Sequence, residues 1–164
     1  MQAFSTFGTD YVIQNIMNKH QNIPFHLFST GHELLLYYEG HDSEVFNSGQ
    51  AYNVKKQIGS IPNTGFVVIQ HFSLLEDHYD LFEKRAKSDL ESVVQLNGFL
   101  TGRILQRIYD RGYVIMTVWE NKTSYQNCLD IAEFKENILT NQTSYQHIIN
   151  QAFTKYYYII EEEK

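Results

Sequence analysis

The side chains that could do chemistry in this sequence are a few histidines and one cysteine. His78 follows Glu76 and Asp77, so an acidic partner is available for an imidazole that titrates near neutral pH. His71 follows Gln70 in a strand-like stretch, and the period of a strand places these two side chains on opposite faces. Only one of Gln70 and His71 can therefore face a pocket. For both His71 and His78, the alternative is a solvated side chain on the protein surface.

Other chemistry has little support. His20, His26, His32 and His41 show no metal-ligand spacing with one another, so we predict no metal site. No phosphate-binding glycine loop, nucleophile elbow or His-Glu-x-x-His stretch is present. The single cysteine, Cys128, excludes an internal disulfide and a multi-cysteine cluster. As a thiolate it could bind iron, but a lone cysteine on an apolar helix face is usually a small core residue.

Composition indicates a globular chain rich in sheet. Of its 164 residues 43% are hydrophobic and 20% charged, and 12 Tyr, 11 Phe and one Trp favour sheet surfaces and large pockets. The net charge of −6 argues against a nucleic-acid partner, which requires a basic face. No signal peptide and no apolar stretch of about 20 residues is visible, so we expect a cytoplasmic protein.

The first half, residues 1–62, reads as a β-α-β-β unit. The expected elements are strands at Ala3–Phe7, Phe25–Ser29 and Glu33–Glu39, a helix at Asp10–Lys19, a hairpin strand at Ser43–Phe46 and a short helical turn at Ala51–Ile58. The turn cluster Ser60–Gly65 marks the boundary with the second half.

The second half, residues 63–164, reads as β-α-β-β-α-β. Strands are expected at 66–73, 99–108, 113–120 and 154–160, with a long helix opening at Glu76 and a short one at 121–129 continued by Phe134 and Ile138. This order predicts an α+β, ferredoxin-like domain with two helices on one face of a sheet. The open sheet face must be covered by a second subunit, giving a homodimer, or by the N-terminal half packed on the sheet.

Several motifs resemble the antibiotic biosynthesis monooxygenase (ABM) family, whose fold is a dimeric α+β barrel. They are Gly98-Phe99, Tyr113–Glu120 with Trp119 at the strand end, Tyr125, and Phe134-Lys135. Three further segments, Phe4–Thr9, Tyr52–Gly59 and Glu76–His78, resemble a subgroup with the staphylococcal TRAP proteins and the HmoB-type haem monooxygenases.

The resemblance implies where haem chemistry would be found. Haem-degrading members use an Asn on the first strand and a Trp and an iron-binding His on the second helix. Here the Asn position falls on Gln70, or on His71 with a slip of one, the Trp position on Cys128 and the His position on Ile138. The usual mechanism is therefore not expected. Trp119 is retained, but we expect it to fill the core.

We therefore predict a TRAP-like regulatory or ligand-binding protein with a sheet-backed pocket for a small hydrophobic ligand, cytoplasmic or peripherally membrane-associated. In the TRAP pattern the residue at His78 is proposed as a phosphorylated, regulatory histidine. The alternative is a haem-binding or haem-degrading monooxygenase that uses His71 or His78, with Ile138 and Trp119 near the cofactor. A third interpretation is a structural protein whose pocket is filled by aromatic residues.

Overall fold

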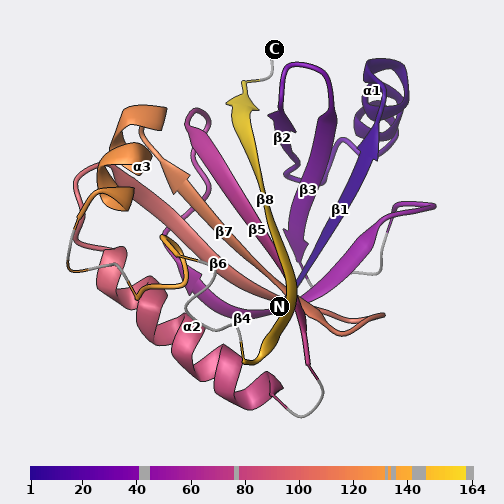
Figure 1. Ribbon diagram of the computed structural model, residues 1–164. Coiled ribbons are helices and arrows are strands. Elements are labelled where there is room, and N and C mark those ends of the chain that lie inside the picture. Colours follow the sequence, from indigo (N-terminus) through magenta and orange to yellow (C-terminus); the bar gives the residue numbers. More distant parts are fainter. Residues whose placement is uncertain (41–44, 76–77, 132, 134–135, 142–146, 162–164) are drawn as a thin grey trace.

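The strands of the chain close into one antiparallel barrel (Figure 1). The computed structural model describes residues 1–164 except 41–44, 76–77, 132, 134–135, 142–146 and 162–164. Neighbouring strands follow the order β1-β3-β2-β8-β5-β7-β6-β4, and β4 returns to β1. The elements are β1 (Gln2–Gly8), α1 (Asp10–Lys19), β2 (His26–Ser29), β3 (Leu34–Gly40), β4 (Gln50–Ile58), β5 (Phe66–Leu74), α2 (Tyr79–Val93), β6 (Phe99–Arg107), β7 (Gly112–Trp119), α3 (Lys122–Leu129) and β8 (Ile149–Ile160).

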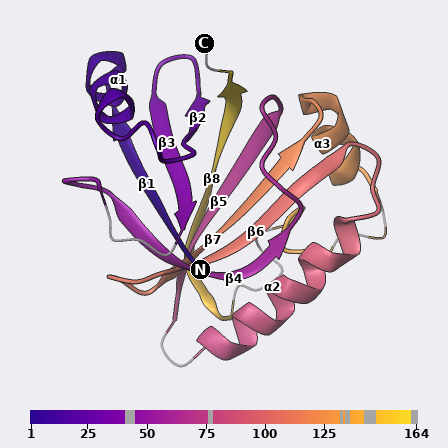
Figure 2. The same ribbon diagram turned by 180° about the vertical axis from the view of Figure 1, so that it is seen from behind.

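The second half is the predicted ferredoxin-like unit. Its strands lie in the order β8-β5-β7-β6, and α2 and α3 cover their outer face (Figures 1 and 2). The helical spacing of α2 buries Phe82, Ala86, Leu90 and Val93 completely against this face. Gly98 precedes β6 at φ +88°, where a Cβ would collide with the Ser124 side chain on α3. The α+β prediction is therefore confirmed.

The first half has the same strand arrangement. Its four strands lie in the order β2-β3-β1-β4, that is second, third, first and fourth, and the second half repeats this order when read from β6 to β8. Helix α1 covers the outer face of this half, and residues 45–49 contain no helix where the second half has α3. The N-terminal half thus resembles a second ferredoxin-like unit within the described residues.

The two halves cover each other's inner face. β2 pairs with β8 and β4 pairs with β6, both antiparallel, so the inner faces of the two sheets become the interior of one barrel. Of the two ways to cover the open face, the intramolecular one is found. A homodimer would have to use another surface.

Several local predictions were wrong. Residues 51–58 form most of strand β4 and not a helical turn; a bulge between Val54 and Lys56 interrupts the alternation by which a strand is recognised. Strand β8 begins at Ile149, before the predicted start. Helix α3 ends at Leu129, so Ile138 lies beyond it, while Phe134 is outside the described residues. The predicted hairpin strand at 43–46 is also partly outside them, and Val45 and Phe46 are not in a strand.

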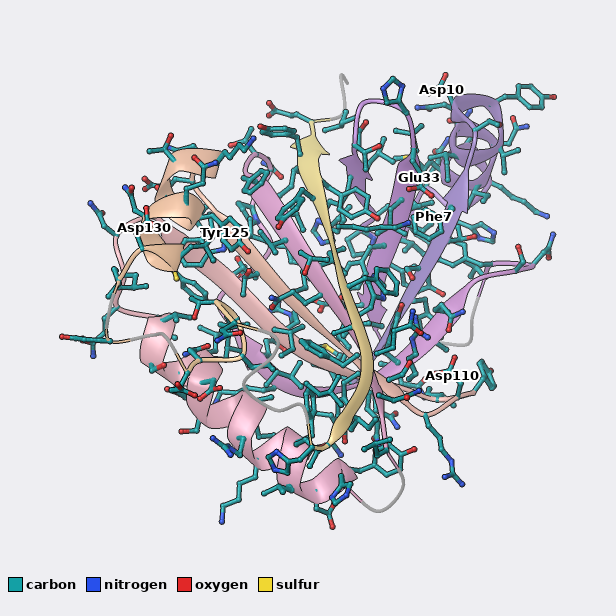
Figure 3. The ribbon with its side chains drawn as sticks, viewed as in Figure 1. Phe7, Asp10, Glu33, Asp110, Tyr125 and Asp130 are labelled. Atoms are coloured by element: carbon teal, nitrogen blue, oxygen red, sulfur yellow. The ribbon has the colours of Figure 1, made fainter. Side chains whose placement is uncertain are left out.

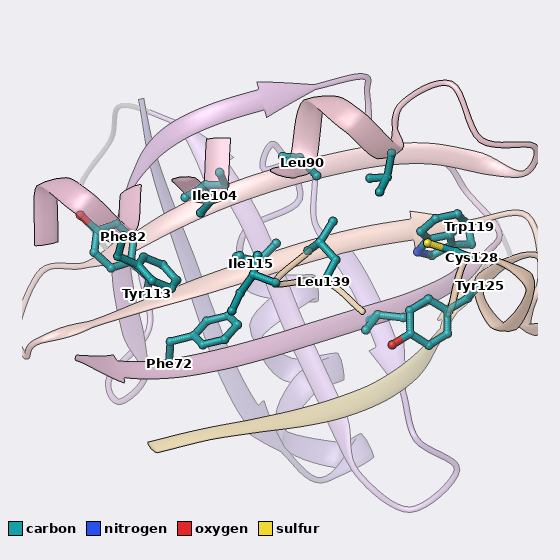
Figure 4. Close-up of a cluster of buried hydrophobic side chains, with 14 of the residues drawn as sticks. Phe72, Phe82, Leu90, Ile104, Tyr113, Ile115, Trp119, Tyr125, Cys128 and Leu139 are labelled. Carbon is teal, nitrogen blue, oxygen red and sulfur yellow. The ribbon is translucent and has the colours of Figure 1, made fainter. Parts of the chain in front are cut away.

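The buried side chains form three clusters. One fills the space between the outer sheet face and α2 and α3, and it includes Phe82, Trp119 and Cys128 (Figure 4). A second fills part of the barrel interior, and a third lies under α1 around Ile13 and Met17. Each face of the closed sheet is therefore a packing surface, as the high aromatic content predicts.

A buried ion pair crosses the barrel interior. Arg103 on β6 is 1% exposed, and its Nε and Nη2 donate to the carboxylate of Glu39 on β3 at 2.7 and 3.3 Å. Its Nη1 donates to the carbonyl oxygens of Ile58, Gly59 and Gly102 at 2.8–3.1 Å. These bonds tie the N-terminal half to the second half through strands that do not pair with each other.

We expect Glu39→Gln to destabilise the fold strongly. The amide oxygen still accepts from the hydroxyl of Tyr37, but the Arg103 cation loses its counter-charge, a loss that typically costs about 3–5 kcal/mol. The control is Lys87→Gln, which removes only a partly exposed pair with Glu83 (side chains 37% and 20% exposed) and should cost below about 1 kcal/mol. Urea unfolding measures both. Equal losses in the two variants would contradict this role of the pair.

Candidate functional site

The positions predicted to correspond to the haem-degrading residues, Gln70, Cys128 and Ile138, are packed at the outer face of the sheet. Gln70 is 3% exposed, and its Nε2 donates to the carbonyl oxygen of Leu139 at 3.1 Å. Cys128 and Ile138 are buried in the same cluster as Leu139 and Trp119, which Figure 4 shows together with Cys128. These positions are therefore filled by protein atoms.

The chemistry of these side chains does not fit a haem iron. Burial raises the pKa of the Cys128 thiol to about 11, which disfavours the thiolate that would bind iron. Ile138 offers no ligand atom. Trp119 fills the core at the strand end, where its Nε1 donates to Thr117 at 3.0 Å and its ring meets Phe99 edge-on. These positions therefore supply no ligand for a haem iron at this face.

His71 lies on the opposite face of β5, inside the barrel. As expected from strand alternation, the side chains of Gln70 and His71 lie on opposite faces of the sheet. The alternative prediction of an outward, solvated His71 side chain is wrong, because barrel closure turns this face inward. His71 lines a cavity of about 160 Å³. The lining residues are Ser5, Phe7, Leu35, Tyr37, Gln50, Tyr52, Ile69, His71, Leu105, Arg107, Val114, Met116, Phe153 and Lys155.

The inner wall of this cavity is apolar. Ile69, Leu105, Val114 and Met116 come from three neighbouring strands, and each is at most 5% exposed. The rim is more open, since Phe7 and Phe153 are nearly half exposed. The shape suits a ligand with an apolar body and a polar end.

The imidazole of His71 is held neutral at the rim. Its ring stacks on Phe153 at a centroid distance of 4.4 Å, and its Nδ1 lies 3.3 Å from Nη2 of Arg107. A guanidinium only donates, so Nδ1 accepts and Nε2 carries the proton of the neutral ring. Burial lowers the pKa of His71 to about 4, with smaller contributions from Arg107 and Lys155.

Two cations share this rim. Arg107 Nη1 donates to Asp110 at 3.2 Å on the β6–β7 hairpin, and Lys155 Nζ lies 3.4 Å from Glu33 and 5.0 Å from the centre of the Phe7 ring. Figure 3 shows Phe7, Glu33 and Asp110 around this end of the barrel. The sequence pattern gave no signal for either cation, because only the register of β5 with β7 and β8, and of β6 with β7, places Arg107 and Lys155 beside His71.

His78 lies elsewhere, at the start of α2. It is the cap residue before Tyr79, partly buried, and its side chain makes no capping hydrogen bond. The predicted helix opening at Glu76 would place His78 inside the helix. This is wrong, because α2 begins at Tyr79 and His78 precedes it. Its suggested partners, Glu76 and Asp77, lie outside the described residues. A regulatory role for His78 stays a prediction.

Comparisons with known proteins agree with this architecture. The family model of antibiotic biosynthesis monooxygenases matches residues 65–137, which confirms the predicted resemblance to that family. The chain is 25% identical to the signal transduction protein TRAP of Staphylococcus aureus over 98% of this chain and 99% of the relative. It is 20% identical to a heme-degrading monooxygenase of Listeria monocytogenes over 77% of this chain and 75% of that protein.

Solved structures show the same fold. A major regulator of staphylococcal pathogenesis superposes with a TM-score of 0.86 at 18% identity, covering 99% of this chain and 100% of the other. A heme-degrading enzyme from Listeria monocytogenes superposes with a TM-score of 0.73 at 18% identity, over 96% and 98% of the two chains. The two-part ABM scaffold is thus found in proteins named for signalling and for haem degradation.

Two further observations concern metals and membranes. Within the described ranges, no group of three or more His, Cys, Asp or Glu is placed to hold a metal ion. None of the helices in those ranges is long and apolar enough to cross a bilayer.

We expect part of the acid sensitivity of the fold to come from His71. Its folded pKa of about 4 lies below the ordinary value of 6.5, so between these values only the unfolded chain binds the proton. The contribution of His71 to the unfolding free energy is complete above 6.5 and declines as the pH falls toward 4. In His71→Gln the difference in unfolding free energy between about pH 7 and about pH 5, measured in urea, should shrink.

The control for this measurement is His32→Gln. His32 is exposed and outside the cavity lining, so its replacement should leave the acid sensitivity of the wild type in place. An unchanged difference in His71→Gln would show that the buried imidazole does not set this sensitivity.

Proposed function

We propose that this chain is a ligand-binding regulatory protein on the ABM scaffold, which takes a small, mainly apolar molecule into the barrel interior and does not degrade haem. The observation that carries the proposal is the contrast between the two faces of β5, of which one is packed and the other lines a cavity. The outer face, where Gln70 lies, is packed. The inner face, where His71 lies, lines the cavity.

The size of the cavity supports a small ligand. An apolar cavity of about 150 Å³ holds a benzene molecule, whereas sites for drug-sized ligands occupy about 300–1,000 Å³. The cavity of about 160 Å³ fits a single ring and is far too small for a haem macrocycle. This size also argues against His71 as a haem ligand, the arrangement that the alternative haem-binding interpretation requires.

The similarity to TRAP supports the regulatory part of the proposal. That relative is named for signal transduction, and the match extends over nearly the whole of both chains. In the sequence comparison, the heme-degrading relative matches over a smaller share of each chain, 77% and 75%. A ligand that binds the folded barrel and not the unfolded chain stabilises the barrel, so ligand concentration sets the fraction of folded protein.

We expect no stoichiometric haem binding, because the outer-face positions lack an iron ligand and the inner cavity is too small. Titration of the purified protein with micromolar hemin should give no saturable shift of the Soret band. Added reductant should cause no loss of that band beyond the loss seen for free hemin. The heme-degrading monooxygenase of Listeria monocytogenes, titrated in parallel, serves as the positive control.

A saturable Soret shift would contradict the proposal and favour the haem-binding alternative. In that case His71→Ala and His78→Ala identify the ligand, because the shift should disappear in the variant that removes it. A shift that survives both substitutions would point to a residue that neither interpretation names.

We also expect a neutral ring-sized molecule to bind inside the barrel. The inner wall of the cavity is apolar, and its volume of about 160 Å³ is close to that of a cavity that holds benzene. Benzyl alcohol added to isotopically labelled protein should shift amide resonances around Ile69 and Val114 in a saturable manner. Val114→Phe should remove this response, since the added ring occupies the cavity. Chemical-shift changes confined to amides at the protein surface would contradict binding inside the barrel. Identical changes in wild type and Val114→Phe would contradict it as well.

A further inference from the structure

We propose that the barrel cavity selects a ring-sized carboxylate, with the ring on the apolar inner wall and the carboxylate at the rim against Arg107 and Lys155. This inference rests on the proposed function and names its ligand class. Neither the ABM resemblance nor the similarity to TRAP assigns a ligand to this side of the sheet.

The charge of the lining is the first argument. Among the described residues, the cavity lining contains two cations, Arg107 and Lys155, and no Asp or Glu. Asp110 and Glu33 pair with these cations from outside the lining, and their side chains are 50% and 41% exposed. Exposed pairs of this kind are weak, so the carboxylates can leave the cations to an incoming anion at little cost.

An unused donor is the second argument. The Nε of Arg107 is buried and has no hydrogen-bond partner in the described part of the chain. Buried donors without partners are rare in native structures, and a ligand oxygen is one way to satisfy such a group. A carboxylate that accepts from a guanidinium forms a charge-assisted bond, which is stronger than a bond between neutral groups.

His71 supports the same orientation of the ligand. With Nδ1 accepting from Arg107, the neutral ring keeps its Nε2–H as a further donor at the rim. Phe153 stacks on the imidazole and holds the ring in place. The rim therefore offers donors from β5, β6 and β8. In the deeper wall, Ile69, Leu105, Val114 and Met116 offer apolar contacts for the body of the ligand, beside the buried hydroxyl-bearing side chains of Ser5, Tyr37 and Tyr52.

The selectivity can be measured with benzoate and benzyl alcohol, which share a ring and differ in charge. Binding is followed by amide chemical shifts in the full-length protein. The charge-assisted bonds should make benzoate bind at least about tenfold more tightly than benzyl alcohol. Arg107→Gln should remove most of this preference, and Lys155→Gln should reduce it.

Controls separate selectivity from folding. Lys122→Gln removes a cation on α3, outside the cavity lining, and should leave the preference for benzoate intact. Arg107→Gln should still bind benzyl alcohol, which shows that its barrel is folded and its cavity present.

Equal affinity for the two probes, or an equal effect of Arg107→Gln and Lys122→Gln, would overturn the inference and leave the proposed function standing. Binding of neither probe inside the barrel would overturn the inference and the proposed function together.

Discussion

The buried guanidinium of Arg103 is the constraint around which the barrel is arranged. A charge inside the barrel has to be paired and its donors have to be used, because an unpaired buried charge costs several kcal/mol. Glu39 supplies the counter-charge from β3, and the carbonyl oxygens of Ile58, Gly59 and Gly102 accept the remaining bonds. These partners come from both halves of the chain, so the ion pair is satisfied only when the halves are joined.

Joining the halves also pairs the edge strands of the two sheets and covers their inner faces. An open four-stranded sheet would leave unpaired backbone groups at β6 and β8, which are sites for unwanted pairing. The N-terminal half pairs with both edges through β4 and β2. One chain therefore forms a closed barrel from two units of the same strand order. The N-terminal half covers the face and edges that a partner subunit would otherwise cover.

Barrel closure gives the two faces of each strand different roles. On β5, Gln70 belongs to the packed outer face and His71 to the cavity, and a shift of one residue in register would exchange them. At the outer face, the positions predicted for the catalytic Trp and the iron-binding His hold Cys128 and Ile138, which are buried there. The interior keeps a small cavity with an apolar wall and a cationic rim. These two facts, taken together, favour a ligand-binding role over an oxidative one.

Local pattern in the sequence determined much of this protein. Helical spacing located α1 and most of α2, the short break between the expected strands 99–108 and 113–120 located the β6–β7 hairpin, and the residue types at Cys128 and Ile138 argued against an iron site. Tertiary structure alone decided that residues 51–58 form a strand, that His71 faces inward, and that Arg107 and Lys155 lie beside it. The physical reason is that periodicity reports on neighbours along the chain, whereas barrel closure and register depend on hydrogen bonds between strands far apart in sequence.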